Sequence, residues 1–102
     1  MKKTATTILA SALFGTAAVA QFVWDGGGAD GNWSSDNWTN VAPPADSFND
    51  AFQFGGTANL RTVNDLTGGT ATSITFDSGA GAFTLGGNSL TLGGNITNNS
   101  TS

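Results

Sequence analysis

The chain of 102 residues lacks several residue types on which most enzymatic sites depend. It contains no cysteine, histidine, glutamate or tyrosine, so the usual bases and nucleophiles are missing. Beyond Lys2 and Lys3, the groups that remain are Arg61 and the side chains of aspartate, serine and threonine. The seven aspartates could in principle supply the carboxylate pair of a glycosidase. Isolated aspartates among glycine and asparagine are more often turn formers, so we expect no catalysis in this segment.

Positive charge is almost confined to the start of the chain. Lys2 and Lys3 precede an apolar run over residues 8–19, and the run ends in the small-x-small pattern Ala18-Val19-Ala20. This order is typical of a secretory signal peptide, which predicts that residues 1–20 are removed during export. A membrane-spanning helix needs about 20 consecutive apolar residues, whereas this run is shorter and is interrupted by polar residues and glycine.

The remaining segment is strongly acidic. Arg61 is its one cation against seven aspartates, and one minus seven gives a formal charge of -6. Nucleic acid binding needs a basic surface, so a nucleic acid partner is excluded. Small secreted domains often depend on disulfides, yet no cysteine is present. A segment of this size buries only about 60% of its unfolded surface, so we expect it to be part of a larger protein.

A regular alternation begins at residue 51. Short apolar and polar alternations, separated by glycine, asparagine and aspartate, predict strands and turns, and no helical spacing follows residue 20. The recurring unit, apolar-polar-apolar with threonine mostly in the middle, occupies residues 52–54, 74–76, 83–85 and 90–92, with a weaker copy at 96–98. Phe52, Ile74 and Ile96 are spaced by 22 residues and again by 22, and Val63 and Leu85 share this offset. Such a period is typical of stacked repeats.

These patterns predict an all-β fold, a parallel β-solenoid with coils of about 22 residues and three short strands each. Phe52, Ile74 and Ile96 would then lie above one another as an internal ladder. Two residues depart from the pattern, because Gly68 stands where Leu90 predicts an apolar residue and Asn98 replaces Phe76. A small antiparallel sandwich or meander is the alternative fold. We expect residues 21–50 to form an N-terminal cap region and residues 51–102 to form the first repeats, continuing beyond the chain end.

All three tryptophans, Trp24, Trp33 and Trp38, lie in the stretch "WDGGGADGNWSSDNW" of residues 24–38. Its glycine, aspartate, asparagine and serine residues predict a compact loop. On one interpretation the rings cover the open first coil, where their apolar area is buried and their N–H groups find carbonyls. On the other, the three rings form a platform for a sugar. The position directly ahead of the first strands favours the cap.

The oxygen-rich stretch "DGGGADGN" at residues 25–32 invites comparison with calcium loops, since calcium takes six to eight oxygen ligands. Its spacing matches neither the loop with ligands at alternate positions nor the Gly-Gly-x-Gly-x-Asp repeat. We therefore predict no metal site and no cofactor.

The sequence resembles bacterial autotransporter-associated β-strand repeat proteins. The resemblance rests on "WDGGGADGNWSSDNW" after the predicted signal peptide, Pro43-Pro44, "DSFNDAFQFGG" and "SITFDSGAGAFTLGGNSLTLGGNITNNS", and extends over residues 24–102. It implies a large exported protein with a β-helical stalk on, or released from, a Gram-negative-type cell surface. Some members carry a C-terminal β-barrel translocator and others a short sorting segment, and neither is present here.

Together these observations predict a non-enzymatic, exported structural or surface-interaction protein at the cell surface, in the outer membrane or outside the cell. Surface glycans or other cells are the expected partners, with no membrane span after residue 20. One alternative is a small secreted carbohydrate-binding module that uses Trp24, Trp33 and Trp38. Another is a secreted hydrolase whose catalytic part lies further along the protein.

Overall fold

The computed structural model describes residues 22–102, so the predicted signal peptide at residues 1–20 lies outside the described residues. This part of the chain is all-β and contains no helix, hence no helix long and apolar enough to cross a membrane. Its strands are β2 (Phe22–Trp24), β3 (Asn49–Phe54), β4 (Arg61–Asn64), β5 (Thr70–Phe76), β6 (Thr84–Gly87), β7 (Thr91–Leu92) and β8 (Ile96–Asn98).

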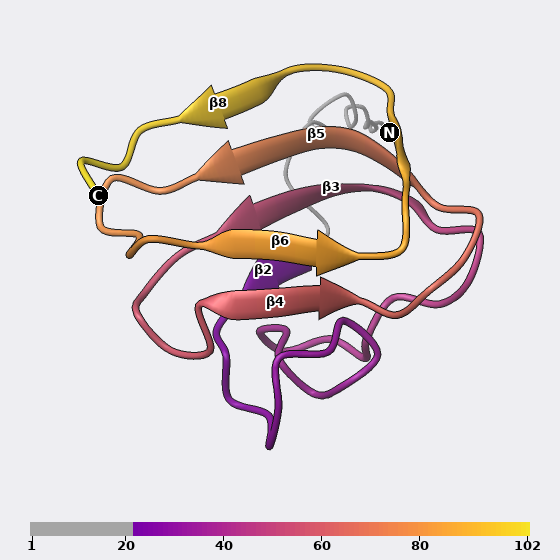
Figure 1. Ribbon diagram of the computed structural model, residues 1–102, viewed down its shortest axis with the longest axis horizontal. Coiled ribbons are helices and arrows are strands. Elements are labelled where there is room, and N and C mark those ends of the chain that lie inside the picture. The colour runs from indigo at the N-terminus through magenta and orange to yellow at the C-terminus, as the bar shows by residue number, and fades with distance from the viewer. Residues whose placement is uncertain (1–21) are drawn as a thin grey trace, which may run out of the picture.

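The strands form two sheets through parallel pairing. One sheet has the order β2-β3-β5-β7, with β8 also paired to β5, and the other consists of β4 and β6. In Figure 1 the arrows of β3, β5 and β8 run in one direction and those of β4 and β6 in the other. The chain thus passes from one sheet to the other and returns. All five strand pairs between residues 22 and 102 are parallel, so the antiparallel sandwich or meander is wrong.

The predicted alignment of the ladder is confirmed, whereas Ile96 is 57% exposed and not internal. Phe52 lies opposite Ile74, and Ile74 lies opposite Ile96, in consecutive parallel strands. The structure adds a step that the periodicity did not predict, because Phe22 of β2 lies opposite Phe52. The register shifts by one residue between Asp50 and Ala51, which marks a β-bulge where β3 meets β5.

The alignment predicted for the second sheet is wrong by one residue. Leu85 lies opposite Thr62, and Val63 lies opposite Gly86. Six residues separate β3 from β4, whereas seven separate β5 from β6, so the longer turn displaces the offset in this sheet from 22 to 23. Because alternate residues of a strand face opposite sides, this shift turns Thr62 inward and leaves Val63 41% exposed.

The two departures from the repeat pattern have different structural positions. Gly68 lies in the turn before β5 with φ +72°, a left-handed conformation that glycine adopts without steric cost. The turn therefore needs a glycine there, and an apolar residue would be strained. Asn98 is an exposed residue of β8 and lies opposite Phe76 of β5.

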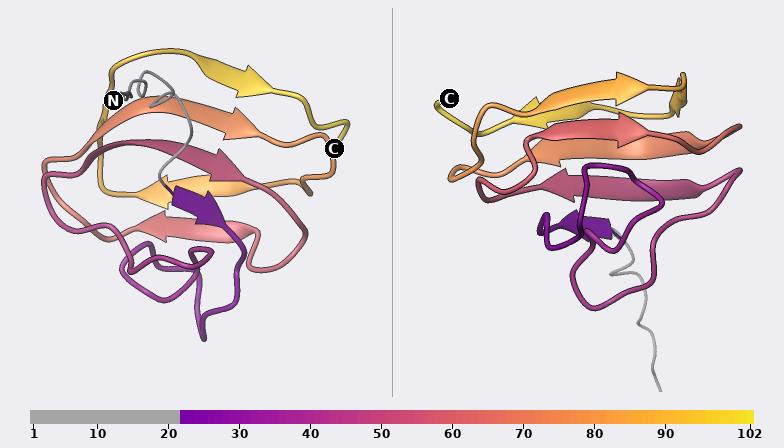
Figure 2. Two further views of the ribbon diagram at one scale, coloured as in Figure 1. Left: turned by 180° about the vertical axis from the view of Figure 1, so that it is seen from behind. Right: turned by 60° about the horizontal axis from the view of Figure 1, so that its bottom comes forward.

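The core lies between the two sheets and is mainly aromatic. Its buried residues are Trp24, Trp33, Trp38, Phe48, Phe52, Phe54, Leu66, Ala71 and Ile74. The second view in Figure 2 shows β2 and the loop that follows it at one end of the stacked strands, and β6 and β8 at the other. Strand β3 spans the boundary expected between residues 50 and 51, and both sides of that boundary contribute to one core.

Candidate functional site

The three tryptophans lie together at the N-terminal end of the strand stack. Trp24 is the last residue of β2, lies opposite Phe54 and forms an antiparallel bridge with Trp38. Trp33 adjoins the second sheet, since its backbone N–H donates to the carbonyl of Val63 at 2.9 Å and Asn32 forms a parallel bridge with Val63. The segment between residues 22 and 38 therefore adds one strand to the first sheet and a short bridged stretch to the second. We call residues 22–38 the aromatic cap.

The rings of the aromatic cap pack against each other at edge-to-face angles. The centroid of Trp38 lies 4.9 Å from that of Trp24 and 5.9 Å from that of Trp33, with interplanar angles of 86° and 87°. Trp33 in turn contacts Phe52 at 5.0 Å, and Trp24 contacts Phe54 at 5.8 Å. Edge-to-face pairs at such separations are favourable beyond the area that they bury. The rings thus cover Phe52 and Phe54 of β3 at the N-terminal end of the strand stack.

Each indole N–H group has an acceptor inside the protein. Trp33 donates to Oγ1 of Thr62 at 3.0 Å, and Trp38 donates to the carbonyl of Trp33 at 2.9 Å. Trp24 donates to the carbonyl of Ala58 at 3.2 Å. A buried N–H without a partner would cost stability, so these three bonds allow the rings to be buried completely.

This burial bears on the sugar-platform alternative. Trp24, Trp33 and Trp38 are at most 2% exposed, and their faces contact other aromatic rings. A sugar that stacks on tryptophan needs an accessible ring face. The geometry therefore argues against a platform formed by these three residues and agrees with their interpretation as a cap.

The loop of the aromatic cap is organised by Asn37, a fully buried side chain. Its Nδ2 donates to the carbonyls of Asp30 at 2.9 Å and Asn32 at 3.0 Å. Its Oδ1 accepts from the N–H of Gly28 at 2.8 Å. Each polar atom of the side chain thus has partners, as a buried amide requires. Adjacent residues thus have separate roles, because Asn37 fixes the loop while Trp38 enters the core.

A second asparagine, Asn59, attaches this loop to the turn after β3. Asn59 has φ +50°, a left-handed backbone conformation. Its Nδ2 lies 3.0 Å from the carbonyl of Gly26, 3.2 Å from that of Gly28 and 3.1 Å from that of Asp30. The oxygens that the sequence offered as calcium ligands thus surround an amide of the protein itself. Among residues 22–102, no cluster of three or more acidic side chains is arranged to hold a metal ion.

Two aspartates also brace the loop. Asp65 accepts from the N–H of Ser34 at 3.0 Å and from its hydroxyl. The hydroxyl of Ser35 and the N–H of Asn32 both donate to Asp30, which lowers the pKa of this carboxyl below its ordinary value of 3.8. Hydrogen bonds to a carboxylate favour its charged form. Asp30 therefore acts as a turn former, in line with the expectation from the sequence, whereas Asp65 joins the loop to the residues after β4.

Asparagines that the sequence pattern did not point out connect the ends of β4 and β6, the paired strands of the second sheet. Asn64, a buried residue at the end of β4, donates through Nδ2 to the carbonyl of Asn88 at 3.1 Å. Asn88 donates back through its own Nδ2 to the carbonyl of Leu66 at 3.0 Å. Their spacing of 24 residues differs from the 22 of the ladder, so the periodicity alone did not align them.

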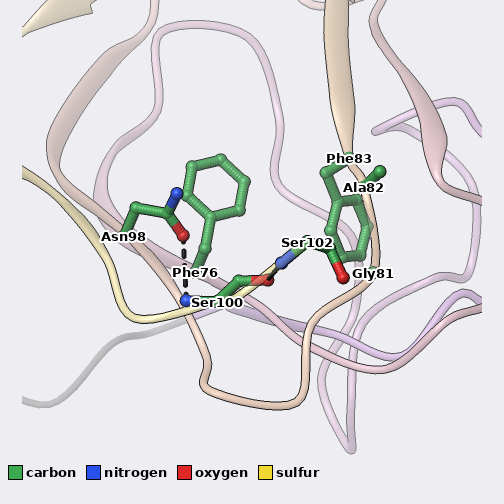
Figure 3. Close-up of a pocket in the computed structure, with 7 residues that line it drawn as sticks. All are labelled: Phe76, Gly81, Ala82, Phe83, Asn98, Ser100 and Ser102. Carbon is green, nitrogen blue, oxygen red and sulfur yellow. Dashed lines mark hydrogen bonds between the residues drawn. The ribbon is translucent and has the colours of Figure 1, made fainter.

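The opposite end of the stack is uncovered. We call the outer side of β6, β7 and β8 the open edge, and there Leu92 is 43% and Ile96 57% exposed. A hollow of about 180 Å³ lies beside it, lined by Phe76, Gly81, Ala82, Phe83, Asn98, Ser100 and Ser102. Figure 3 shows this hollow, where the N–H of Ser100 donates to Oδ1 of Asn98 at 2.9 Å.

Comparisons of the chain with protein-family models, with curated proteins and with solved structures gave no match.

Proposed function

We propose that this chain is a non-enzymatic, exported structural or surface-interaction protein, in which the aromatic cap and the strands after it form the start of a parallel β-solenoid. The observation that carries the proposal is the ladder Phe22, Phe52, Ile74 and Ile96, held in parallel register and covered at one end by buried tryptophans. In stacked repeats each coil contacts mainly its neighbours, so an end of the stack needs an atypical covering unit.

The proposed role is mechanical. Each coil adds a strand to each sheet, and the stack grows along its axis without needing a large globular core. The asparagine bonds between Asn64 and Asn88 and the aromatic stack from Phe22 to Phe52 support this role, because both connect successive coils. Exposed threonine and asparagine side chains, such as those of Thr72, Thr97 and Asn98, offer hydroxyl and amide groups to surface glycans or to other cells.

The cellular setting is proposed from the sequence. The pattern of residues 1–20 favours export, and the resemblance of residues 24–102 to autotransporter-associated repeats favours the N-terminal part of a β-helical passenger. An acidic segment with one arginine and no lysine suits an extracellular location.

The test is the size and location of the native protein in the cells that produce it. An antibody raised against residues 22–102 is applied to intact cells, with and without external protease, and to the culture medium. We expect a protease-sensitive surface signal from a band much larger than the 10.2 kDa of this chain. A signal confined to the cell interior would contradict export. A band near 10 kDa in the medium would contradict the stalk and favour a small secreted module.

A further inference from the structure

The open edge lacks the features by which proteins usually protect exposed strands. Natural edge strands carry charged residues, especially lysine, or proline, which discourage pairing with another strand. The last charged residue of this chain is Asp77, and residues 78–102 contain neither charge nor proline. All seven aspartates and Arg61 lie before this segment. Residues 78–102, which include the strands of the open edge, are thus neutral, whereas residues 22–77 are strongly acidic.

Backbone groups of β8 point away from the sheet. The carbonyl of Asn95 accepts from the N–H of Ile74 at 3.1 Å, and the N–H of Asn99 donates to the carbonyl of Phe76 at 2.9 Å. In a parallel ladder, alternate residues bond to opposite neighbours. The residues between these two, Ile96 and Asn98, therefore direct their backbone donors and acceptors outward, where a further strand would lie.

Hollows with both polar and apolar side chains in their walls accompany the open edge. One of about 300 Å³ is lined by Trp33, Asn64, Ile74, Leu85, Gly86, Gly87, Asn88, Ser89 and Leu90. The hollow of about 180 Å³ contains the side chains of Phe76 and Phe83 in its wall. Ile74 of the ladder lies in the wall of the larger hollow, and each hollow has apolar side chains in its wall beside which a further side chain could pack. An edge of this kind offers main-chain hydrogen bonds for affinity and side-chain hollows for specificity.

We infer that the open edge binds an uncharged, extended polypeptide segment that winds parallel to it, with an apolar side chain above Ile96. Two observations select this partner. The edge is neutral, so a charged strand would gain no ion pair and would desolvate its charge against Ile96 and Leu92. A further strand on the open edge would also repeat a pairing already present, because β6 pairs with β4, and β7 and β8 pair with β5, all in parallel.

The inference rests on the proposed function and names the chemistry of the strand that the stack accepts. The best match in the chain itself is the segment "TLGGNSLTLGGNITN" at residues 84–98, which has no charge and two apolar strand stretches. A peptide of this sequence, supplied separately, is therefore the probe. A peptide with the same residues in scrambled order is its control, because it keeps the composition and loses the alternation.

The experiment titrates each peptide into the isotope-labelled 102-residue protein and follows amide signals by NMR. We expect shift changes concentrated in β6, β7 and β8 with the matching peptide, and changes at least about tenfold weaker in apparent affinity with the scrambled one. The indole N–H signals of Trp24 and Trp38 should not move, because these two rings lie at the opposite end of the stack and their donors are satisfied.

Two protein variants make the test specific. Ile96→Lys places a charge on the ladder side of β8, whereas Thr97→Lys adds the same charge at the next residue, on the opposite face of the sheet. Both positions are exposed, so both variants should retain the indole signals of the folded protein. We expect Ile96→Lys to weaken peptide binding at least about tenfold and Thr97→Lys to change it less than about threefold.

Equal binding of the two peptides, or equal binding by the two variants, would overturn the inference. So would concentration-dependent shifts of the same edge in the absence of peptide, since the edge would then bind a second copy of the folded chain. These outcomes are separate from the surface-location test. A surface protein of large size whose edge rejects the peptide would keep the proposed function and lose this inference.

Discussion

The indole nitrogen of Trp33 lies 3.0 Å from Oγ1 of Thr62, and both side chains are buried. This hydrogen bond joins the aromatic cap to β4, the first strand of the second sheet. The backbone N–H of Trp33 donates to the carbonyl of the adjacent Val63 at 2.9 Å. The cap is therefore attached to the stack through both the main chain and a side chain of the same residue.

Replacing Thr62 by Val tests the side-chain part of this attachment. The substitution keeps the shape of the side chain and leaves the indole N–H of Trp33 buried without an acceptor, which should lower the free energy of unfolding by about 1–3 kcal/mol. Urea unfolding followed by tryptophan fluorescence measures the loss. Val63→Thr is the control, because Val63 is exposed and the change should stay within about 0.5 kcal/mol. Equal stability of both variants would show that the hydrogen bond does not hold the cap.

Two glycines of similar backbone conformation separate steric contact from backbone strain. Gly26 has φ +66° and Gly56 has φ +72°. A Cβ at Gly26 would lie 2.8 Å from the carbonyl carbon of Ala58, whose oxygen accepts from Trp24, whereas a Cβ at Gly56 would meet nothing within 4 Å. Replacement by Ala should cost about 1–2 kcal/mol at Gly56 from the left-handed backbone.

At Gly26 the same replacement should cost about 1–3 kcal/mol more, because the loop must move away from Ala58. Thermal unfolding of the two variants measures the difference. If Gly26→Ala were no less stable than Gly56→Ala, the close approach between the aromatic cap and the turn after β3 would be refuted.

The ladder predicts a gradient of stability from the covered end to the open edge. Phe52 is completely buried, so Phe52→Ala should cost about 3–5 kcal/mol. Ile96 occupies the same ladder but is more than half exposed, so Ile96→Ala should cost less than about 1 kcal/mol. Denaturant unfolding of both variants gives the two values. A loss at Ile96 as large as that at Phe52 would mean that the open edge is covered in solution.

Asp30 gives a dependence on pH with a definite sign. Its pKa is lowered by the hydroxyl of Ser35 and the N–H of Asn32, so its contribution to stability is present above the ordinary value of 3.8. That contribution is lost as the pH falls through the lowered pKa, when the carboxylate is protonated. An NMR titration of the carboxyl carbon measures the midpoint. We expect it below 3.8, with Asp30→Asn removing this dependence, and a midpoint at or above that value would contradict the hydrogen bonds.

The sequence predicted the ladder of the first sheet, because Phe52, Ile74 and Ile96 occur every 22 residues. The apolar side chains of Phe52 and Ile74 fill the core, and Ile96 continues their register. The second sheet was misaligned, since the turn before β6 is one residue longer than the turn before β4. Periodicity counts residues along the chain, so a change in turn length shifts Leu85 from Val63 to Thr62.

The position of the tryptophans was predicted, whereas their attachments were not. Their place ahead of the first strands indicated a cap, but β2 was hidden in a stretch that reads as loop. Asn59 donates to Oδ1 of Asn37, 22 positions earlier, and to carbonyls 29 to 33 positions earlier. The convergence of these atoms depends on the backbone of several glycines. No local pattern distinguishes these asparagines from the others, because their role arises only when the cap meets the first coil.

The central claim is that successive coils stack in parallel, in-register strands, and engineered disulfides test it directly because the chain contains no cysteine. Gln53 lies opposite Thr75, and Thr75 lies opposite Thr97. Neighbouring strands are about 4.8 Å apart, within the Cα separation of up to about 7 Å that a disulfide spans. Gln53 and Thr97 are two strands apart, roughly 9.6 Å.

The measurement is the fraction of intramolecular disulfide formed under mild oxidation by three double-cysteine variants, at positions 53 and 75, 75 and 97, and 53 and 97. We predict nearly complete closure in the first two and almost none in the third. Closure of the pair at positions 53 and 97, or failure of the pair at positions 53 and 75, would contradict the parallel stack on which both the cap and the proposed function depend.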